Sequence, residues 1–358
     1  MNNHPKVSII ILNWNGKEDT LECLTSVAKI NYSTYELIVV DNGSTDNSVK
    51  AIRSQFPNVH IIETKENLGF AEGNNVGIRH ALSSGSDFIL LLNNDTWVDK
   101  NFLDHLVTEA KITNNAFIYG PTIFYADKKN TIWFSGAKWN TDKLAFDFPL
   151  QNHLKHELPS KPFETDYICG AAMFFHRSIA EKIGLLDKRF FLVWEESDWC
   201  FQARKEGYKS LIVPNAQIWH KIGVSFGSES SPLRLFFSAR NRLLWIEKNL
   251  SHQLALKTAF QSIWSIIPSF ILSKQNNATL VKRFFWSLIA YIKSWNDLLT
   301  NKARQARLLG VFNYILRIFG CMALIYVSSF KSFKINIELS FLSSTFVKTE
   351  SVGIVSNR

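Results

Sequence analysis

Three carboxylates lie within four residues near the middle of the chain, at Glu195, Glu196 and Asp198. Four aromatic residues flank them: Phe190, Phe191, Trp194 and Trp199. Like charges at close range, desolvated by apolar neighbours, raise the pKa of at least one carboxyl group. A carboxylate with a raised pKa is suited to take a proton as a general base. The alternative is an ordinary helix start, because the helix dipole there offsets acidic charge.

Asp95 and His220 form a second candidate site. Asp95 closes the polar turn Asn93-Asn94-Asp95 after an apolar run, and His220 follows Trp219 at another strand end. Hard divalent cations prefer oxygen ligands, and manganese also accepts an imidazole. If the fold brings the two residues together, they can supply two protein ligands to Mn²⁺ or Mg²⁺. A plain strand-ending turn and a packed histidine are the alternatives.

Polar side chains also follow three apolar, strand-like runs near the N-terminus. They are Asn13, the pair Asp41-Asn42 and the segment Asn67-Leu68-Gly69. Asp and Asn can bond a base and a ribose, whereas glycine lets backbone N–H groups approach phosphates. Such Asx–Gly pairs also form ordinary turns, which is the alternative. Neither G-x-G-x-x-G nor G-x-x-x-x-G-K-[ST] occurs, so dinucleotide-binding and P-loop sites are disfavoured.

The elements that must position these residues alternate between strand and helix. Strands are predicted at 7–12, 35–40, 58–63, 88–92 and 117–124, and helices at 17–29, 44–54 and 99–114, with a further helix opening within 66–75. Ser44 or Thr45 is the expected N-cap of the second helix. After irregular sequence at 125–165 come a strand at 169–175, a helix to about 183, a helix to 206, and strands at 208–213 and 218–220. This pattern predicts a doubly wound, mainly parallel α/β sheet, whose ligands bind outside the carboxyl ends of the strands.

Charge is distributed unevenly along the chain. Of its 358 residues, residues 231–358 hold 17 Lys and Arg against 4 Asp and Glu, whereas the first 230 residues hold 23 against 27. The 13% aromatic content favours contact with sugar, lipid or a membrane surface. We therefore expect a catalytic domain at 1–230 and a basic, aromatic extension at 231–358 that meets an anionic surface.

The cysteines and the N-terminus bear on the compartment. Cys23, Cys169, Cys200 and Cys321 show no C-x-x-C spacing. They are expected to be buried thiols of a reducing compartment rather than disulfides or a zinc site. The first residues lead directly into a strand-like run, so no secretory signal is expected.

The basic extension contains three aromatic, apolar segments, at 254–273, 279–299 and 311–330. Spanning a bilayer needs about 20 predominantly apolar residues, and Asn313 and Arg317 interrupt the segment that comes nearest to this length. Amphipathic helices lying on an anionic membrane are therefore predicted, with an ordinary helical cap on the domain as the alternative. Nucleic acid is disfavoured, because no recognition motif accompanies the charge.

Taken together, these motifs resemble the family-two inverting glycosyltransferases, and among them the rhamnosyltransferase-like branch that builds bacterial surface polysaccharides. The resemblance covers about residues 6–245 in the right order. The matching stretches are Val7 to Asn15, Val39 to Asp46, Glu66 to Asn75, Leu92 to Thr96, Gly184 to Asp198 and Ile218 to His220.

The resemblance implies a GT-A fold and transfer of a sugar, with inversion, from a nucleoside diphosphate sugar to a hydroxyl group. It implies that Asp41 recognises the base, that Asp95 and His220 bind the metal, and that Glu196 takes the proton from the acceptor. The other donor-binding residues that it suggests are Asn13, Asn42, Asn67, Gly69, Asn74 and Asn94. Arg240, in the run Arg240-Asn241-Arg242, is expected to fold over the diphosphate, with a solvated basic helix as the alternative.

Two departures from the family pattern stand out. Asn93 replaces the first Asp of the D-x-D motif, which puts metal dependence in question. Glu195-Glu196 replaces the usual Glu-Asp pair, so Glu195 and Asp198 remain alternatives to Glu196 as the base. The loss of one acidic ligand also leaves open a binding or scaffold protein without catalysis. A nucleotidyltransferase is disfavoured, because Asn13-Trp14-Asn15-Gly16 is not the Gly-rich basic loop of that class.

The same resemblance suggests the partners. The first candidate donor is dTDP-rhamnose, with UDP- and GDP-hexoses behind it, and the expected acceptor is a saccharide or a lipid-linked saccharide. A cytoplasmic protein held peripherally at the inner face of the cell membrane would suit such an acceptor and the basic extension.

Overall fold

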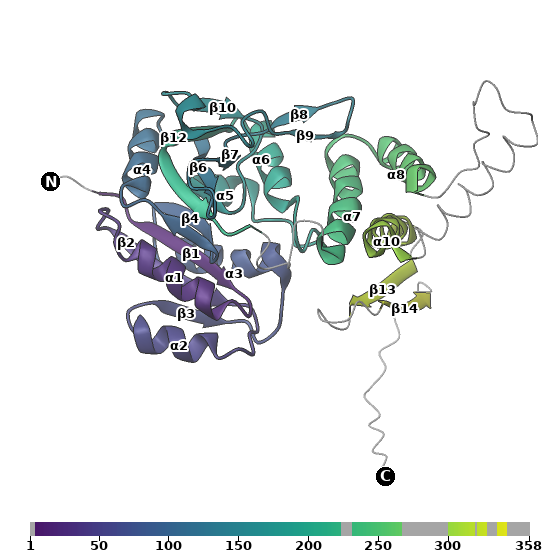
Figure 1. The fold of residues 1–358 in the computed structure, drawn as a ribbon, viewed down its shortest axis with the longest axis horizontal. Helices are drawn as coiled ribbons and strands as arrows, with labels where there is room; N and C mark the ends of the chain where they lie inside the picture. Colours follow the sequence, from purple (N-terminus) through teal and green to yellow (C-terminus); the bar gives the residue numbers. More distant parts are fainter. Residues whose placement is uncertain (1–3, 223–230, 267–299, 319–320, 328–334, 342–358) are drawn as a thin grey trace, which may run out of the picture.

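The computed structural model describes residues 4–222, 231–266, 300–318, 321–327 and 335–341 (Figure 1). The strands of the first part are β1 (Val7–Asn13), β2 (Tyr35–Asp41), β3 (His60–Glu63), β4 (Phe88–Asn93), β5 (Thr96–Val98), β6 (Phe117–Tyr125), β7 (Ile132–Phe134), β8 (Lys138–Asn140), β9 (Ala145–Asp147), β10 (Phe163–Thr165), β11 (Ala172–His176) and β12 (Lys209–His220). The α-helices there are α1 (Lys17–Val27), α2 (Ser48–Gln55), α3 (Gly69–Ser83), α4 (Phe102–Ile112), α5 (Arg177–Ile183) and α6 (Glu195–Lys205).

One large sheet runs through the first part of the molecule, in the order β10-β12-β6-β11-β4-β1-β2-β3. The pairs β1–β2, β1–β4, β2–β3 and β12–β6 are parallel, and β11 is antiparallel to both of its neighbours. The predicted mainly parallel sheet is therefore confirmed. β1 and β4 are apolar on both faces, as central strands covered on both sides must be.

The register of the central strands brings the polar strand ends to one edge. Asn13 pairs with Asp41, and Leu12 pairs with Asn93. Helix α3 packs closely on β1, because a Cβ at Gly73 would lie only 2.6 Å from Leu12. The first turn of α3 is thereby held beside the carboxyl ends of the central strands.

The predicted second helix begins later than expected, at Ser48, and neither Ser44 nor Thr45 caps it. Ser44 instead accepts hydrogen bonds from the Asn13 side chain and the Asn15 backbone. Its hydroxyl is therefore used in the strand-end network. The two strands predicted at 208–213 and 218–220 form the single strand β12, with an irregularity between Val213 and Gln217.

Three helices gather at one side of the sheet domain: α7 (Pro232–Asn249), α8 (His252–Ile266) and α10 (Lys302–Ile318) (Figure 1). They share a second apolar cluster built around Phe190, Trp245 and Tyr314. Helix α8 confirms part of the helix predicted at 254–273, whereas 279–299 lies outside the described residues. The helix predicted at 311–330 ends at Ile318, and Cys321–Val327 is a strand, β13, paired with β14 (Ile335–Phe341).

Two predictions about cysteines and membrane spanning can be compared with the structure. Cys23, Cys169 and Cys200 are buried free thiols, as expected, whereas the side chain of Cys321 is outside the described part. Over the described ranges, none of the helices combines the length and the apolar character needed to cross a bilayer.

Candidate active site

A cavity of about 530 Å³ opens at the carboxyl ends of the central strands. One side is lined by residues at the carboxyl ends of the strands or in the segments that follow them: Leu12, Asn42, Asn67, Asn93, Asn94 and Asp95. The opposite side comes from the loop before α6, the first turn of α6 and the start of α7. The cavity thus lies where an open α/β sheet binds its ligands.

The side chains after β1 and β2 hold each other in place. Asn13 donates from Nδ2 to Asp41 Oδ1 over 2.8 Å, and its Oδ1 accepts from Thr20. The second oxygen of Asp41 accepts from the Ser44 backbone N–H over 3.0 Å. Asn13 and Asp41 are 0% and 3% exposed, and neither lines the cavity. These two predicted donor-binding residues therefore meet each other inside the protein rather than at the cavity surface.

Asn42, Asn67 and Gly69 do line the cavity. Asn42 Nδ2 donates to Asn67 Oδ1 and to the Gly69 carbonyl, each over 3.1 Å. The N–H groups of Leu68 and Gly69 already donate to the Asn42 and Asn67 side chains, and that of Phe70 donates to a carbonyl. The expectation that backbone N–H groups here approach a phosphate is therefore not supported. The asparagines instead shape the cavity wall.

Two further predicted donor residues differ in position. Asn94 lines the cavity and donates from Nδ2 to the Thr20 hydroxyl over 3.0 Å. Asn74 is 1% exposed and donates to the Phe70 carbonyl one turn back in α3, so it does not line the cavity. Its role in the structure is to stiffen the first turns of that helix.

Asp95 and His220 meet although 125 positions separate them in the chain. The antiparallel pairing of β5 with β12 places His220 opposite Thr96, and the Lys221 N–H donates to the Asp95 carbonyl. Asp95 Oδ1 and His220 Nε2 lie 2.9 Å apart, and the two residues are 4% and 7% exposed. The strand pairing thus assembles the predicted pair at the cavity.

The pair fits a divalent cation by chemistry and spacing. Octahedral coordination at about 2.1 Å puts neighbouring ligand atoms roughly 3 Å apart, close to the observed 2.9 Å between Asp95 Oδ1 and His220 Nε2. The other ring nitrogen of His220 is buried and has no hydrogen-bond partner among the described residues. Within the same residues, no group of three or more His, Cys, Asp or Glu is arranged for a metal. Asp95 and His220 are therefore the two residues whose chemistry and spacing fit such an ion.

Glu195 and Glu196 stand at the start of α6 and line the cavity. Glu195 is 3% exposed, and one carboxylate oxygen of each residue is buried without a hydrogen-bond partner in the described structure. Burial raises the pKa of Glu195 well above its usual range, and the charge of Glu196 raises it further. Burial also raises the pKa of Glu196, opposed by backbone hydrogen bonds and by Arg234. This is the environment expected of a general base.

The loop before these acids has an unusual backbone. Phe191, Val193 and Trp194 have φ values of 62°, 60° and 78°, the left-handed region that residues with a Cβ rarely adopt. Each such residue costs on the order of 1–3 kcal/mol and persists only where its surroundings enforce it. The strain lies directly before the acids.

Two further predicted site residues, Asp198 and Arg240, also lie away from the cavity. Asp198 is 1% exposed and accepts from Lys248 Nζ over 2.6 Å and from Asn249 Nδ2 over 2.9 Å, so it joins α6 to α7. Arg240 donates from Nη2 to the carbonyls of Arg189 and Phe190. Neither lines the cavity, so the structure supports neither Asp198 as a base nor Arg240 over a diphosphate.

Other residues reach the cavity without having been singled out. Arg234 lines it from the first turn of α7. Aromatic residues that also line the cavity include Trp133, Phe134, Phe146, Phe148, Tyr167 and Trp194. The Trp133 ring lies 4.7 Å from that of His220 in an edge-to-face arrangement. The sequence shows that 125–165 is rich in aromatic residues, but it does not show that several of their side chains point into the cavity.

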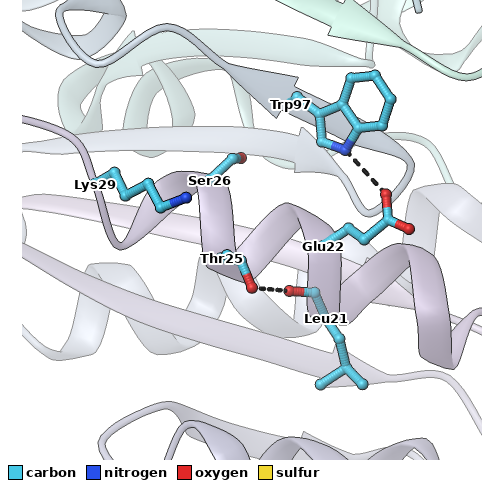
Figure 2. Close-up of a pocket in the computed structure, with 6 residues that line it drawn as sticks. All are labelled: Leu21, Glu22, Thr25, Ser26, Lys29 and Trp97. Carbon is cyan, nitrogen blue, oxygen red and sulfur yellow. Dashed lines mark hydrogen bonds between the residues drawn. The ribbon is translucent and has the colours of Figure 1, made fainter.

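A smaller hollow of about 340 Å³ lies on the outer side of α1 (Figure 2). It is lined by Leu21, Glu22, Thr25, Ser26 and Lys29 of α1 together with Trp97. The Trp97 indole donates to Glu22 over 3.1 Å, and Lys221 also binds Glu22. Glu22, the one carboxylate that lines this hollow, is thus already paired. The Glu195–Glu196 pair and the Asp95–His220 pair both line the larger cavity.

Comparison with known proteins identifies the kind of domain that carries this cavity. The model of the Glycosyl transferase family 2 matches residues 8–184. The dTDP-rhamnosyl transferase RfbF of Shigella flexneri is 24% identical over 75% of this chain and 88% of its own length. The low-salt glycan biosynthesis hexosyltransferase Agl10 of Haloferax volcanii is 27% identical over 66% and 74%. An N-acetylglucosaminyl-diphospho-decaprenol L-rhamnosyltransferase of Mycobacterium tuberculosis is 24% identical over 58% and 73%.

Two solved structures share the fold. GalNAc-T7 with UDP, GalNAc and Mn²⁺ aligns with a TM-score of 0.57 and 16% identity, covering 84% of this chain and 59% of that chain. The mannosyltransferase PcManGT of Pyrobaculum calidifontis, in complex with GDP-Man and Mn²⁺, aligns with a TM-score of 0.50 and 13% identity, covering 89% and 88%. The mixed sheet with its later helices is thus the architecture of GT-A glycosyltransferases. Residues 8–184 are a glycosyl transferase family 2 domain, and the chain is a glycosyltransferase.

Proposed function

We propose that this enzyme transfers rhamnose, with inversion, from a nucleoside diphosphate sugar to a saccharide carried on a lipid, in the synthesis of a cell-surface polysaccharide. The observation that carries the proposal is a single cavity lined by Asn42 and Asn67, by the Asp95–His220 pair and by the Glu195–Glu196 pair. The names of two relatives contain rhamnose as the transferred sugar, which supports rhamnose in the proposal, and one of these names contains a diphospho-decaprenol acceptor, which supports an acceptor on a lipid.

The donor side of the proposal rests on the strand ends. Asn42 and Asn67 fix each other through a hydrogen bond, so a nucleotide meets a wall that needs little ordering when it binds. Buried Asp41 anchors the loop that follows β2 through its bond to the Ser44 N–H. In this proposal Asp41 acts on the base through that loop.

Asp95 and His220 are the residues that would hold Mn²⁺ or Mg²⁺. Such an ion, when bound, neutralises charge on a diphosphate leaving group. The wall around the pair keeps bulk water away, because both side chains are almost completely buried. Asn93 supports the turn through its backbone carbonyl, which accepts from Thr96 Oγ1 over 2.7 Å.

Glu196 is the proposed general base. It is more exposed than Glu195 and lines the cavity from the first turn of α6. Its carboxylate takes the proton from the acceptor hydroxyl, whose oxygen then bonds to the anomeric carbon while the bond to the diphosphate breaks on the opposite face. Attack from the face opposite the leaving group inverts the configuration at that carbon.

The aromatic wall suits a sugar acceptor. Phe146 lies 4.6 Å from Tyr167 and 5.8 Å from Trp194 between ring centroids, so these rings form a continuous apolar surface beside the acids. Sugar rings present apolar C–H faces that stack on such surfaces, while their hydroxyls point at polar groups. An acceptor stacked here would lie near Glu196, which shares the same cavity wall.

Helix α8 offers a contact for an anionic membrane. Phe260 and Trp264 are 54% and 75% exposed, and Lys257 is exposed three residues before Phe260, on the same face of the helix. Exposed aromatic and basic side chains at this spacing are typical of helices that lie in a bilayer interface. We therefore propose peripheral attachment at the inner face of the cell membrane, in the cytoplasm. Co-sedimentation with phosphatidylglycerol vesicles, and its loss in the Trp264→Ser variant, would support this.

The proposed function is tested with purified protein and a panel of dTDP-, UDP- and GDP-sugars, with and without Mn²⁺. Thermal shift identifies the donor, and release of the nucleoside diphosphate measures its turnover. We expect dTDP-rhamnose to give the largest shift and to be consumed when Mn²⁺ is present. Binding without turnover of any donor would contradict the enzyme and favour a sugar-nucleotide-binding scaffold.

A further inference from the structure

The loop of residues 190–194 is held from outside the sheet domain. Phe190 is completely buried in the apolar cluster that α7, α8 and α10 share. The Phe191 ring stacks on Phe237 of α7, with 5.2 Å between ring centroids. The left-handed backbone before the acids therefore rests against α7, a helix that begins about 40 residues later in the chain (Figure 1).

Asn241 of α7 supplies the polar part of this contact. Its side chain is 0% exposed, and Nδ2 lies within 2.7–2.8 Å of the carbonyl oxygens of Phe190, Leu192 and Val193. One amide group has two hydrogens, so three carbonyls share two donors. The Phe190 carbonyl also accepts from the Leu192 N–H and from Arg240, so the amide matters most for the carbonyls of Leu192 and Val193.

Arg240 fixes the direction of that amide. Arg240 Nε donates to Asn241 Oδ1 over 2.8 Å, which turns the Nδ2 group toward the loop. The reversed amide would aim its oxygen at three carbonyl oxygens and its nitrogen at a guanidinium. Arg240 Nη2 binds the Arg189 and Phe190 carbonyls as well, so the two neighbouring residues act on the loop together.

The held loop connects both sides of the cavity. The Phe191 carbonyl accepts from the Phe70 N–H at the start of α3, and a Cβ at Gly69 would lie 2.5 Å from the Phe191 ring. Four residues after Phe191 the chain enters the first turn of α6 with Glu195 and Glu196. The position of Phe191 thus sets the acids relative to the donor wall.

We propose that Arg240 and Asn241 are positioning residues that hold the 190–194 loop, and through it the Glu195–Glu196 pair, at the distance from the donor that transfer requires. The inference rests on the proposed role of Glu196 as the base. It gives the extension after residue 230 a role in the reaction even though these two residues do not line the cavity.

The direct test is hydrogen exchange of the full-length protein carrying Asn241→Ala. We expect amides of 190–194 to exchange at least about tenfold faster, because the loop carbonyls lose the Asn241 donor and the strained turn opens locally. Asn249→Ala is the matched control: it removes another asparagine of α7, one that binds Asp198 and Gln202 of α6 instead. Unchanged exchange in Asn241→Ala, or equal acceleration in the control, would overturn the proposal.

The kinetic test separates positioning from simple destabilisation. With dTDP-rhamnose as probe, Asn241→Ala should lower kcat about 100-fold, as expected when a reacting group is displaced by about 1 Å, while the Kd for dTDP changes less than about threefold. Its pH–rate profile should also move to lower pH, because a loosened loop admits water to the acids. Faster exchange with an unchanged kcat would sink the positioning role.

Arg240→Lys is the milder second variant, since lysine can reach one carbonyl but cannot also orient Asn241. We expect the exchange rates of 190–194 and the kcat of Arg240→Lys to lie between those of wild type and Asn241→Ala. Values equal to wild type would count against the joint role of Arg240 and Asn241. If wild-type protein fails to turn over dTDP-rhamnose, the proposed donor is wrong. The exchange comparison still decides whether Asn241 holds the loop.

Discussion

The two walls of the cavity are built on opposite principles. On the strand-end wall, Asn42 bonds Asn67, and directly behind it buried Asn13 bonds Asp41; Asn42 and Asp41 also accept from nearby backbone N–H groups. On the α6 wall, carboxylate oxygens of Glu195 and Glu196 are buried without partners in the described structure, after a left-handed turn. In the function proposed above, the first wall recognises the donor, and the second keeps its acids reactive at an expense in stability.

The difference also shows in what holds each wall. Neighbouring parallel strands β1, β2, β3 and β4 position most of the first wall. The second wall depends on Arg240 and Asn241, about 45 residues away along the chain. Substitutions should therefore damage the strand-end wall through folding and the α6 wall through rate.

The largest effect on transfer is expected from substitution in the Asp95–His220 pair. Asp95→Ala should lower transfer at least about 100-fold, because charge on the leaving group is no longer offset. Mn²⁺ binding followed by electron paramagnetic resonance should weaken in the same protein, independently of activity. Asp99→Ala is the control. Asp99 lies four residues after Asp95, and its carboxylate accepts from the Asn101 backbone N–H instead. Wild-type Mn²⁺ binding in Asp95→Ala would rule out the pair as the metal site.

Gly69→Ala should break the contact between the walls. Gly69 has φ +79° and no room for a Cβ, because Phe191 lies 2.5 Å from its position. Gly85→Ala shares the strained backbone, with φ +75°, but has nothing within 4 Å. Urea unfolding should show about 1–3 kcal/mol more destabilisation at Gly69, the usual range for overpacking. Equal losses would mean that the Phe191 contact contributes nothing.

Asp41→Ala tests the strand-end wall. It leaves the Asn13 amide and the Ser44 N–H without their acceptor, so we expect a loss of about 1–3 kcal/mol in the free energy of unfolding and weaker dTDP binding. Glu63→Ala is a matched control, since Glu63 pairs with Asp41 in the sheet register but makes an exposed ion pair with Arg53. A control loss as large as that of Asp41→Ala would contradict the buried network.

The smallest expected effect concerns pH and the α6 wall. The raised pKa values of Glu195 and Glu196 mean that the folded protein holds these protons more tightly than the unfolded chain. The stability that these protonated groups contribute is fully present below the ordinary glutamate pKa of 4.5, and it is lost as the pH rises through their raised pKa values. The difference in Tm between Glu195→Gln and wild type should therefore shift in favour of the variant by on the order of 2–4 °C as pH rises from 4 to 8. A constant difference would show that the acids titrate normally.

The sequence was informative about the strand-end wall. Its apolar runs end in Asn or Asp, and parallel strands necessarily bring these ends to one edge. The sequence could place Asp95 and His220 at strand ends, but only the β5–β12 pairing shows that they touch. The raised pKa at the acid cluster was likewise predictable from three carboxylates among aromatic residues.

The α6 wall was harder to predict because side-chain direction decides it. Arg240 was expected at the diphosphate, yet Arg234, six residues earlier on α7, lines the cavity. Six residues turn a helix by about 600°, so the two side chains point roughly 120° apart. Asp198 lies three residues after Glu195 in α6 but is taken up by Lys248 and Asn249 of α7. Packing between α6 and α7 fixed these outcomes, and no local pattern encodes it.

The central claim is that Glu196 removes the acceptor proton while the other wall binds the donor. Its most direct test is Glu196→Gln, measured for dTDP affinity and for transfer from dTDP-rhamnose on the same sample, with Glu195→Gln alongside. We predict unchanged dTDP affinity and a loss of transfer of about 10³-fold in Glu196→Gln. Near-normal transfer by Glu196→Gln, or a larger loss in Glu195→Gln, would contradict the assignment.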